Sequence, residues 1–170
     1  MAYTELEDGL KVLECQECRG RWIQSFYYWK WREKHGKSLP ERPAGGGSEL
    51  PVRDTPAAKL CPECGHILIR YPVGHEVEFR LDRCGNCGGI WLDRNEWENL
   101  KQRNLHDDIH KFFSATWQRQ VREEESKKSR EFLLREKFGD RDYDKLIETK
   151  NWITEHALSH EILAFLEDRG

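Results

Sequence analysis

Two Cys-x-x-Cys pairs, Cys61/Cys64 and Cys84/Cys87, are the residues of this chain best suited to bind a metal ion. Nineteen residues separate the pairs, a spacing typical of structural zinc sites with four cysteine ligands. Glycines follow both pairs, and glycine permits the positive φ angles of a tight turn around a metal. Because four thiolates complete the tetrahedron of Zn²⁺, they leave no position for water. The spacing therefore predicts one structural Zn²⁺ and disfavours zinc-hydroxide chemistry.

The segment between the two pairs predicts a β-hairpin that brings them together. Ile67, Ile69 and Tyr71 alternate with other residues before an expected turn at residues 72–75, and a second alternating run follows at 77–81. Such a period of two is typical of strands. We therefore assign the zinc to the two pairs that flank this hairpin.

A third pair, Cys15 and Cys18, lies near the start of the chain. Its surroundings align without gaps with those of the pair at Cys84 and Cys87. The alignment also places Gly20 on Gly89, Trp22 on Trp91 and Ile23 on Leu92. We interpret the N-terminal segment as a second copy of the C-terminal half of a zinc ribbon, without the matching first pair.

Three roles remain open for Cys15 and Cys18. They could bind a second Zn²⁺ together with histidines such as His35, or join the same pair of another subunit in a shared four-cysteine site, which would make a homo-oligomer. They could also be a reduced remnant that binds no metal. A thioredoxin-like redox role is disfavoured, because the flanking residues lack a βαβ pattern.

Residues 21–37 combine aromatic and basic side chains. Six of the ten residues from Trp22 to Trp31 are aromatic, and five cations in the segment accompany one acid. Such a surface suits stacked bases and phosphates. The alternative is a packed core on a short helix, with Trp22, Phe26 and Trp29 on the buried face. The residues predicted to contact nucleic acid or a protein partner are Arg21, Tyr27, Tyr28, Lys30, Trp31, Arg32, Lys34 and Lys37.

Composition limits the classes of protein to which the chain can belong. Its net charge of −3 gives no general attraction to phosphates, so binding to nucleic acid must rely on a local patch. All six cysteines lie in pairs and no signal peptide is evident, which favours a reducing cytoplasm. No apolar run approaches the roughly 20 residues that a membrane span needs. The chain also lacks a nucleophile elbow, a phosphate loop and a dinucleotide fingerprint, so we expect no enzyme.

The C-terminal part of the chain predicts helices. Asp93 and Glu96 have the spacing of a capping box at a helix start. Apolar residues recur at helical spacing after Asp107, and Ser159 can cap a last short helix. Residues 119–130 are nearly all charged, as in a solvated helix or a mobile connector.

Together these patterns predict a small α+β protein with four regions. These are an N-terminal half-ribbon segment with an aromatic and basic helix (1–38), a Pro/Gly-rich linker (39–59), the zinc ribbon (60–100) and a helical C-terminal region (101–170). The linker is expected to let the first segment move relative to the ribbon.

The segment CPECGHILI…EVEFRLDRCGNCGGIWLDRNEWENL resembles the prokaryotic zinc-ribbon family named after the zinc finger of transcription factor IIB. The family combines a CPxCG knuckle, a short hairpin and a CxxCGGxWLD knuckle followed by a helix. The resemblance implies a zinc-binding β-ribbon with Cys61, Cys64, Cys84 and Cys87 as ligands and a role linked to nucleic acid or transcription. The N-terminal copy departs from the pattern, since Arg19 stands where the ribbon has Gly88.

We therefore predict an adaptor that binds nucleic acid or a nucleoprotein assembly through residues 21–37. The alternative is a protein-interaction or oligomeric assembly module without direct contact to nucleic acid. In that case the helical tail and the N-terminal aromatic residues would pair with a partner or with a second copy.

Overall fold

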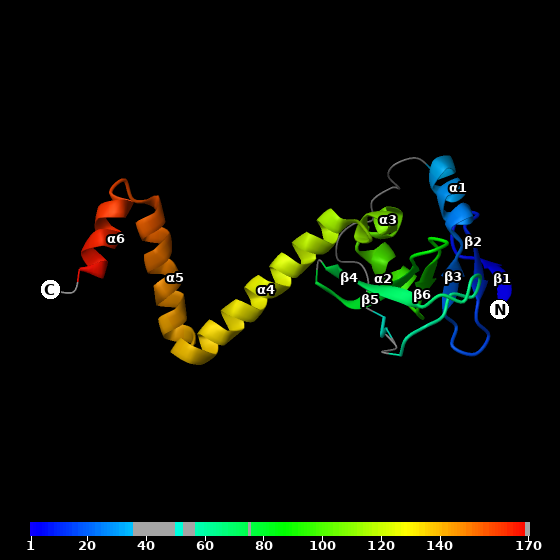
Figure 1. Cartoon of the computed structure of the whole chain (residues 1–170), viewed down its shortest axis with the longest axis horizontal. Coiled ribbons are helices and arrows are strands. Elements are labelled where there is room, and N and C mark those ends of the chain that lie inside the picture. Colours follow the sequence, from blue (N-terminus) through cyan, green and yellow to red (C-terminus); the bar gives the residue numbers. More distant parts are fainter. Residues whose placement is uncertain (36–49, 53–56, 75, 169–170) are drawn as a thin grey trace. The chain divides into compact units, whose positions relative to one another are not determined.

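The computed structural model describes residues 1–35, 50–52, 57–74 and 76–168. The chain divides into two compact units, residues 1–121 and 122–170 (Figure 1). The strands are β1 (Ala2–Glu5), β2 (Lys11–Glu14), β3 (Arg21–Ile23), β4 (Leu68–Gly74), β5 (Val77–Cys84) and β6 (Ile90–Leu92). The helices are α1 (Ser25–His35), α2 (Glu96–Gln102), the 3₁₀-helix η1 (His106–Asp108), α3 (Ile109–Phe112), α4 (Ala115–Phe138), α5 (Asp140–Glu155) and α6 (Ser159–Glu167).

Within the described residues, the first unit contains one antiparallel sheet of six strands, in the order β1-β2-β3-β6-β5-β4. At its centre β3 pairs with β6, and Trp22 lies opposite Trp91. The described parts of 1–38 and 60–100, which the sequence divided into two regions, therefore lie in one compact unit. The backbone hydrogen bonds between β3 and β6 extend the ribbon's sheet with the N-terminal strands, which differs from the expected mobile segment. The central part of the linker lies outside the described residues.

Two glycines allow the central strands to approach closely. A Cβ atom on Gly20 would overlap the ring of Trp91, and a Cβ atom on Gly89 would overlap the ring of Trp22. Each glycine thus makes room for the tryptophan of the opposite strand. The contact is reciprocal between positions that the sequence alignment made equivalent.

The main hydrophobic core of the first unit includes residues of the sheet and of α1, α2 and α3. Tyr28 and Trp31 of α1 are buried, with 2% and 4% of their surface exposed, and Trp31 contacts Trp97 of α2 edge to face. Phe26 and Trp29 are 69% and 52% exposed. The predicted buried face of this helix was therefore wrong. The prediction placed Trp22 on the helix, whereas Trp22 lies in β3 and the helix begins only at Ser25.

The ribbon hairpin forms as predicted by β4 and β5, with its details changed. Strand β4 continues to Gly74, so Pro72 and Val73 lie in the strand and not in the turn, with an irregular register between Pro72 and Gly74. Ile69 is half exposed, while the neighbouring Leu68 is buried. Leu68 packs in the cluster of the cysteines, and Val73 packs in the main core.

The predicted capping box is present in part. The backbone N–H of Asp93 donates to Oε2 of Glu96 at 2.7 Å, as a capping box requires. Helix α2 begins at Glu96, after Asn95 in a left-handed conformation.

The second unit is helical. Helix α4 runs without a break through the charged residues 119–130, which resolves the choice between a helix and a connector in favour of a helix. Gly139, with φ +78°, separates α4 from α5. Among the described residues of 122–168 only Ile153 is buried, so this unit has almost no core of its own. No helix of the described chain is long and apolar enough to cross a membrane.

Candidate metal centre

Each Cys-x-x-Cys pair forms a turn with the same two backbone hydrogen bonds. The N–H of the first cysteine donates to the carbonyl oxygen five residues later, and the N–H four residues later donates back to that cysteine's carbonyl oxygen. The bonds are Cys61 N to His66 O (2.8 Å), Gly65 N to Cys61 O (3.0 Å), Cys84 N to Gly89 O (2.9 Å), Gly88 N to Cys84 O (3.0 Å), Cys15 N to Gly20 O (2.8 Å) and Arg19 N to Cys15 O (3.0 Å). We call such a turn a knuckle.

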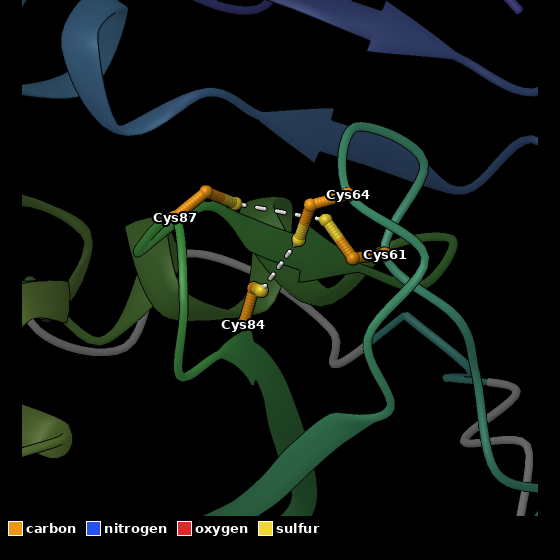
Figure 2. Close-up of side chains that lie close together, drawn as sticks. All are labelled: Cys61, Cys64, Cys84 and Cys87. Carbon is orange, nitrogen blue, oxygen red and sulfur yellow. Dashed lines mark hydrogen bonds between the residues drawn. The ribbon is translucent and has the colours of Figure 1, made fainter.

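The knuckles at Cys61 and Cys84 bring four thiols together (Figure 2). Their sulfur atoms all lie within 4.8 Å of one another. Two sulfur contacts join the knuckles, Cys61 to Cys87 at 3.6 Å and Cys64 to Cys84 at 3.4 Å. Around one zinc ion with Zn–S bonds of about 2.3 Å, ligand sulfurs lie about 3.8 Å apart, so the four thiols fit a single tetrahedral Zn²⁺.

The hairpin register positions these thiols. Leu68, at the start of β4, lies opposite Cys84 at the end of β5, and a single bridge between Leu60 and Ile67 closes the first knuckle. The second knuckle leads directly into β6. The predicted role of the hairpin in joining the two pairs agrees with this geometry.

The side chain of Trp22, in β3, covers the four thiols. This side chain is fully buried and lies in one cluster with Cys61, Cys84 and Leu68. Its indole Nε1–H donates to Oε2 of Glu63, the residue just before Cys64, at 3.1 Å. Sequence reasoning missed this role, although the alignment of Trp22 with Trp91 had already set that residue apart.

Lys59 is a second residue that sequence reasoning missed. It lies just before the first knuckle, and its Nζ binds Oδ2 of Asp82 at 2.5 Å and Oδ2 of Asp93 at 3.0 Å. Asp82 belongs to β5, and Asp93 follows β6. Burial raises the pKa of the Asp82 carboxyl, while the bond to Lys59 opposes this shift. Lys59 therefore links the start of the ribbon to β5 and to the end of β6, the strands on either side of the second knuckle.

Backbone amides and burial act on the thiols in opposite directions. The backbone amide of His66 lowers the pKa of Cys64 to about 6, and the N–H of Glu63 donates to the sulfur of Cys61 at 3.4 Å. Burial raises the pKa of Cys61 and of Cys87. Because zinc binds thiolates, the ion would displace the remaining protons and its affinity would fall in acid. The role of a bound ion would be structural, because four thiolates fill its coordination positions.

The third knuckle stands apart from this cluster. Cys18 is exposed and Cys15 is half buried. In the described parts of the chain, the four-thiol cluster is the only group of three or more potential metal ligands close enough together to hold an ion. His35 therefore does not complete a site with Cys15 and Cys18 there. Its ring nitrogen Nδ1 instead contacts the carbonyl oxygen of Trp31 at 2.8 Å.

The residues predicted to contact nucleic acid have several different environments. Tyr28 and Trp31 lie on the side of α1 that packs into the main core, so both are buried. Their assignment to a contact surface was therefore wrong. Arg21 pairs with Glu14 at 3.3 Å and Glu98 at 2.7 Å, and Arg32 pairs with Asp108 at 3.3 Å. Tyr27 is half buried, Lys30 and Lys34 are exposed, and Lys37 lies outside the described residues.

Two residues outside that prediction, Phe26 and Trp29, are exposed on α1 together with Lys30 and Lys34. We call these four residues the α1 face. Lys30 lies 5.9 Å from the centre of the Phe26 ring, and the Trp29 ring lies 5.3 Å from that of His110.

Two knuckles at the base of a β-hairpin, with four thiols around one point, are the defining features of a zinc ribbon. Residues 60–103 match the model of the family described as transcription factor zinc-finger, which confirms the resemblance seen in the sequence. The match covers the segment that carries the hairpin and all four clustered thiols. No curated protein and no solved structure matched the chain.

Proposed function

We propose that the protein is a non-enzymatic adaptor, built on a structural zinc ribbon, that binds nucleic acid through the α1 face. The exposure of Phe26 and Trp29 beside two lysines is the observation that carries this proposal. The four-thiol site supports a non-enzymatic role, since four thiolates leave zinc no open position for a substrate or water. The cysteine-rich ribbon would require a reducing compartment, and we propose the cytoplasm.

Exposed aromatic rings that gather on one face of a folded unit mark a site where a partner binds. Phe26 and Trp29 lie three residues apart on one helix, so their rings are neighbours on its surface. Successive bases of a single strand can stack on such rings, and Lys30 and Lys34 can attract the phosphates between them. Arg21 and Arg32 contribute less, because each already pairs with a carboxylate.

We also infer that residues 1–35 are a second ribbon-like repeat fused to the ribbon. Three observations support this inference: the shared knuckle hydrogen bonds, the pairing of Trp22 with Trp91, and the reciprocal contacts with Gly20 and Gly89. The strand order also has the same pattern from either edge, with β1, β2 and β3 mirrored by β4, β5 and β6. In this arrangement α1 follows β3 as α2 follows β6, and the repeat serves to present α1.

Binding of a labelled single-stranded oligonucleotide, measured by fluorescence anisotropy at two salt concentrations, tests the proposal. The double substitution Phe26→Ala/Trp29→Ala should weaken binding by about tenfold or more, because each stacked base contributes about 1–3 kcal/mol. Lys30→Gln/Lys34→Gln should reduce the slope of log affinity against log salt concentration by the amount expected for about one to two phosphate contacts. Trp152→Ala removes an equally exposed tryptophan of α5 and is the matched control. A wild-type protein without salt-dependent binding to RNA or DNA contradicts the proposal.

A second candidate function, protein assembly, rests on the helical unit. Its helices expose large apolar side chains, among them Phe132, Leu133, Trp152, Phe165 and Leu166. Helices with so little buried surface gain most of their stability from packing against another element. We propose that a second copy of the same helices provides this packing, since α4 carries an acidic run, Glu123–Glu125, followed closely by Lys127 and Lys128. Two antiparallel copies of α4 can therefore match opposite charges.

Light scattering tests this second candidate. Phe165→Asp/Leu166→Asp should remove the association through the helical unit and lower the molar mass of the wild-type oligomer, because the charges oppose burial of the apolar face. The zinc content should stay unchanged, since the substitutions lie far along the chain from the cysteines. Asp168→Asn, which changes a charge next to the same helix, is the control. A monomeric wild-type protein, or an oligomer unaffected by the double substitution, contradicts assembly through this face.

A further inference from the structure

The knuckle at Cys15 and Cys18 has the backbone of a metal-binding turn. Its two backbone hydrogen bonds repeat those of the two ribbon knuckles within 0.1 Å. Arg19 holds φ at +61°, where Gly65 and Gly88 have +73° and +75° in the other knuckles. This region of φ favours glycine, so the arginine adopts it against its own preference. The fold around the N-terminal knuckle therefore imposes the ribbon geometry on a sequence that departs from the ribbon pattern.

The surroundings of this knuckle also match those of its equivalent in the ribbon. Trp91 packs against Gly20 as Trp22 packs against Gly89. The indole of Trp22 donates to Glu63, which belongs to the knuckle that completes the ribbon site. The indole of Trp91 donates instead to Asp93 at 2.7 Å. Asp93 also binds Lys59 and forms no metal-ligand group with Cys15 and Cys18.

Two thiols are half of a zinc tetrahedron, and the described residues supply no third ligand. We propose that Cys15 and Cys18 form one half of a second Zn²⁺ site, and that the same knuckle of a second copy of the chain completes it. The exposure of Cys18 leaves the knuckle accessible to that copy.

The ribbon itself supports this choice of occupant. There two knuckles with the same backbone hydrogen bonds place their four thiols around one point. A second copy offers an identical knuckle, and a two-fold axis through the metal makes the two contributions equivalent. This site is independent of nucleic-acid binding by the α1 face and of assembly through the helical unit.

Zinc content by elemental analysis and molar mass by light scattering test the proposal together. The full-length protein carrying Phe165→Asp/Leu166→Asp is the background, so that assembly through the helical unit does not contribute. We expect a dimer with about 1.5 Zn²⁺ per chain, because each ribbon holds one ion and two chains share another. Adding Cys18→Ser should give a monomer with about 1 Zn²⁺ per chain. Gln16→Ala, a change in the same knuckle that spares both thiols, should keep the dimer and its zinc.

Substitution of Co²⁺ for Zn²⁺ gives a separate readout. The thiolate-to-cobalt absorption per chain should fall by about one third in Cys18→Ser, and the remaining spectrum should be that of the four-thiolate ribbon. Three outcomes overturn the proposal. They are about 1 Zn²⁺ per chain before the cysteine is changed, about 2 Zn²⁺ per chain in a monomer, and equal metal content with and without Cys18. The second outcome means that one chain completes the site alone.

Discussion

Cys84→Ser is expected to release the ribbon zinc and to unfold the sheet of the first unit. The Cys84 side chain is fully buried at the end of β5, and its sulfur lies 3.4 Å from that of Cys64. Binding of a structural Zn²⁺ contributes about 10–16 kcal/mol in small zinc modules, whereas a whole domain is stable by only about 5–15 kcal/mol. The free energy lost with the metal therefore exceeds the stability that the remaining core provides. Elemental analysis and circular dichroism of the purified variant measure both effects.

The same substitution at Cys18 is the control for this prediction. Cys18 lies outside the four-thiol cluster, so Cys18→Ser should keep the ribbon zinc and the sheet. A Cys84→Ser protein that retains both its zinc and its strand content would contradict the assignment of the four ligands. Because β3 pairs with β6, unfolding should also extend to the N-terminal strands and not stop at residue 60.

Trp22→Ala is expected to destabilise the zinc-loaded protein by about 3–5 kcal/mol, the usual cost of removing a large aromatic side chain from a core. The indole is fully buried against Cys61 and Cys84 and donates a hydrogen bond to Glu63. Its removal would leave a cavity between β3 and the ribbon and would open the thiols to water. Urea denaturation measures the loss of stability, and the rate of zinc transfer to a coloured chelator should rise.

Trp29→Ala makes the same chemical change at an exposed position and is the control. Because Trp29 is 52% exposed, its removal should change the free energy of unfolding by no more than about 0.5 kcal/mol. Equal stability of Trp22→Ala and Trp29→Ala would show that the contact between β3 and the ribbon contributes little.

The sequence alone predicted the features that depend on neighbouring residues. Cys61 and Cys64 lie in one turn, as do Cys84 and Cys87, and the alternating residues between them predict the hairpin that joins the two turns. The back-bond of Glu96 to Asp93 and the end of α4 at Gly139 are also local. Such features depend on hydrogen bonds and backbone preferences within a few residues. Neighbouring residues in the sequence are therefore enough to predict them.

The strands β1 and β2 show where local patterns were too weak. All four residues of β1 are exposed, so this strand has no apolar alternation to reveal it. The phase of α1 failed for a related reason. Aromatic residues stand at almost every position from Phe26 to Trp31, so the pattern favours no single face, and the sheet beneath decides that Tyr28 and Trp31 are buried.

The sequence by itself thus determined a four-cysteine zinc ribbon and a helical C-terminal region. Only the tertiary structure decided that the N-terminal strands join the ribbon in one sheet, that Trp22 covers the thiols, and that Arg21 is paired with Glu98, 77 residues away in the chain. The physical reason is the distance along the chain between the contacting residues. Contacts such as that of β3 with β6 depend on shape and on burial, and no window of sequence contains both partners.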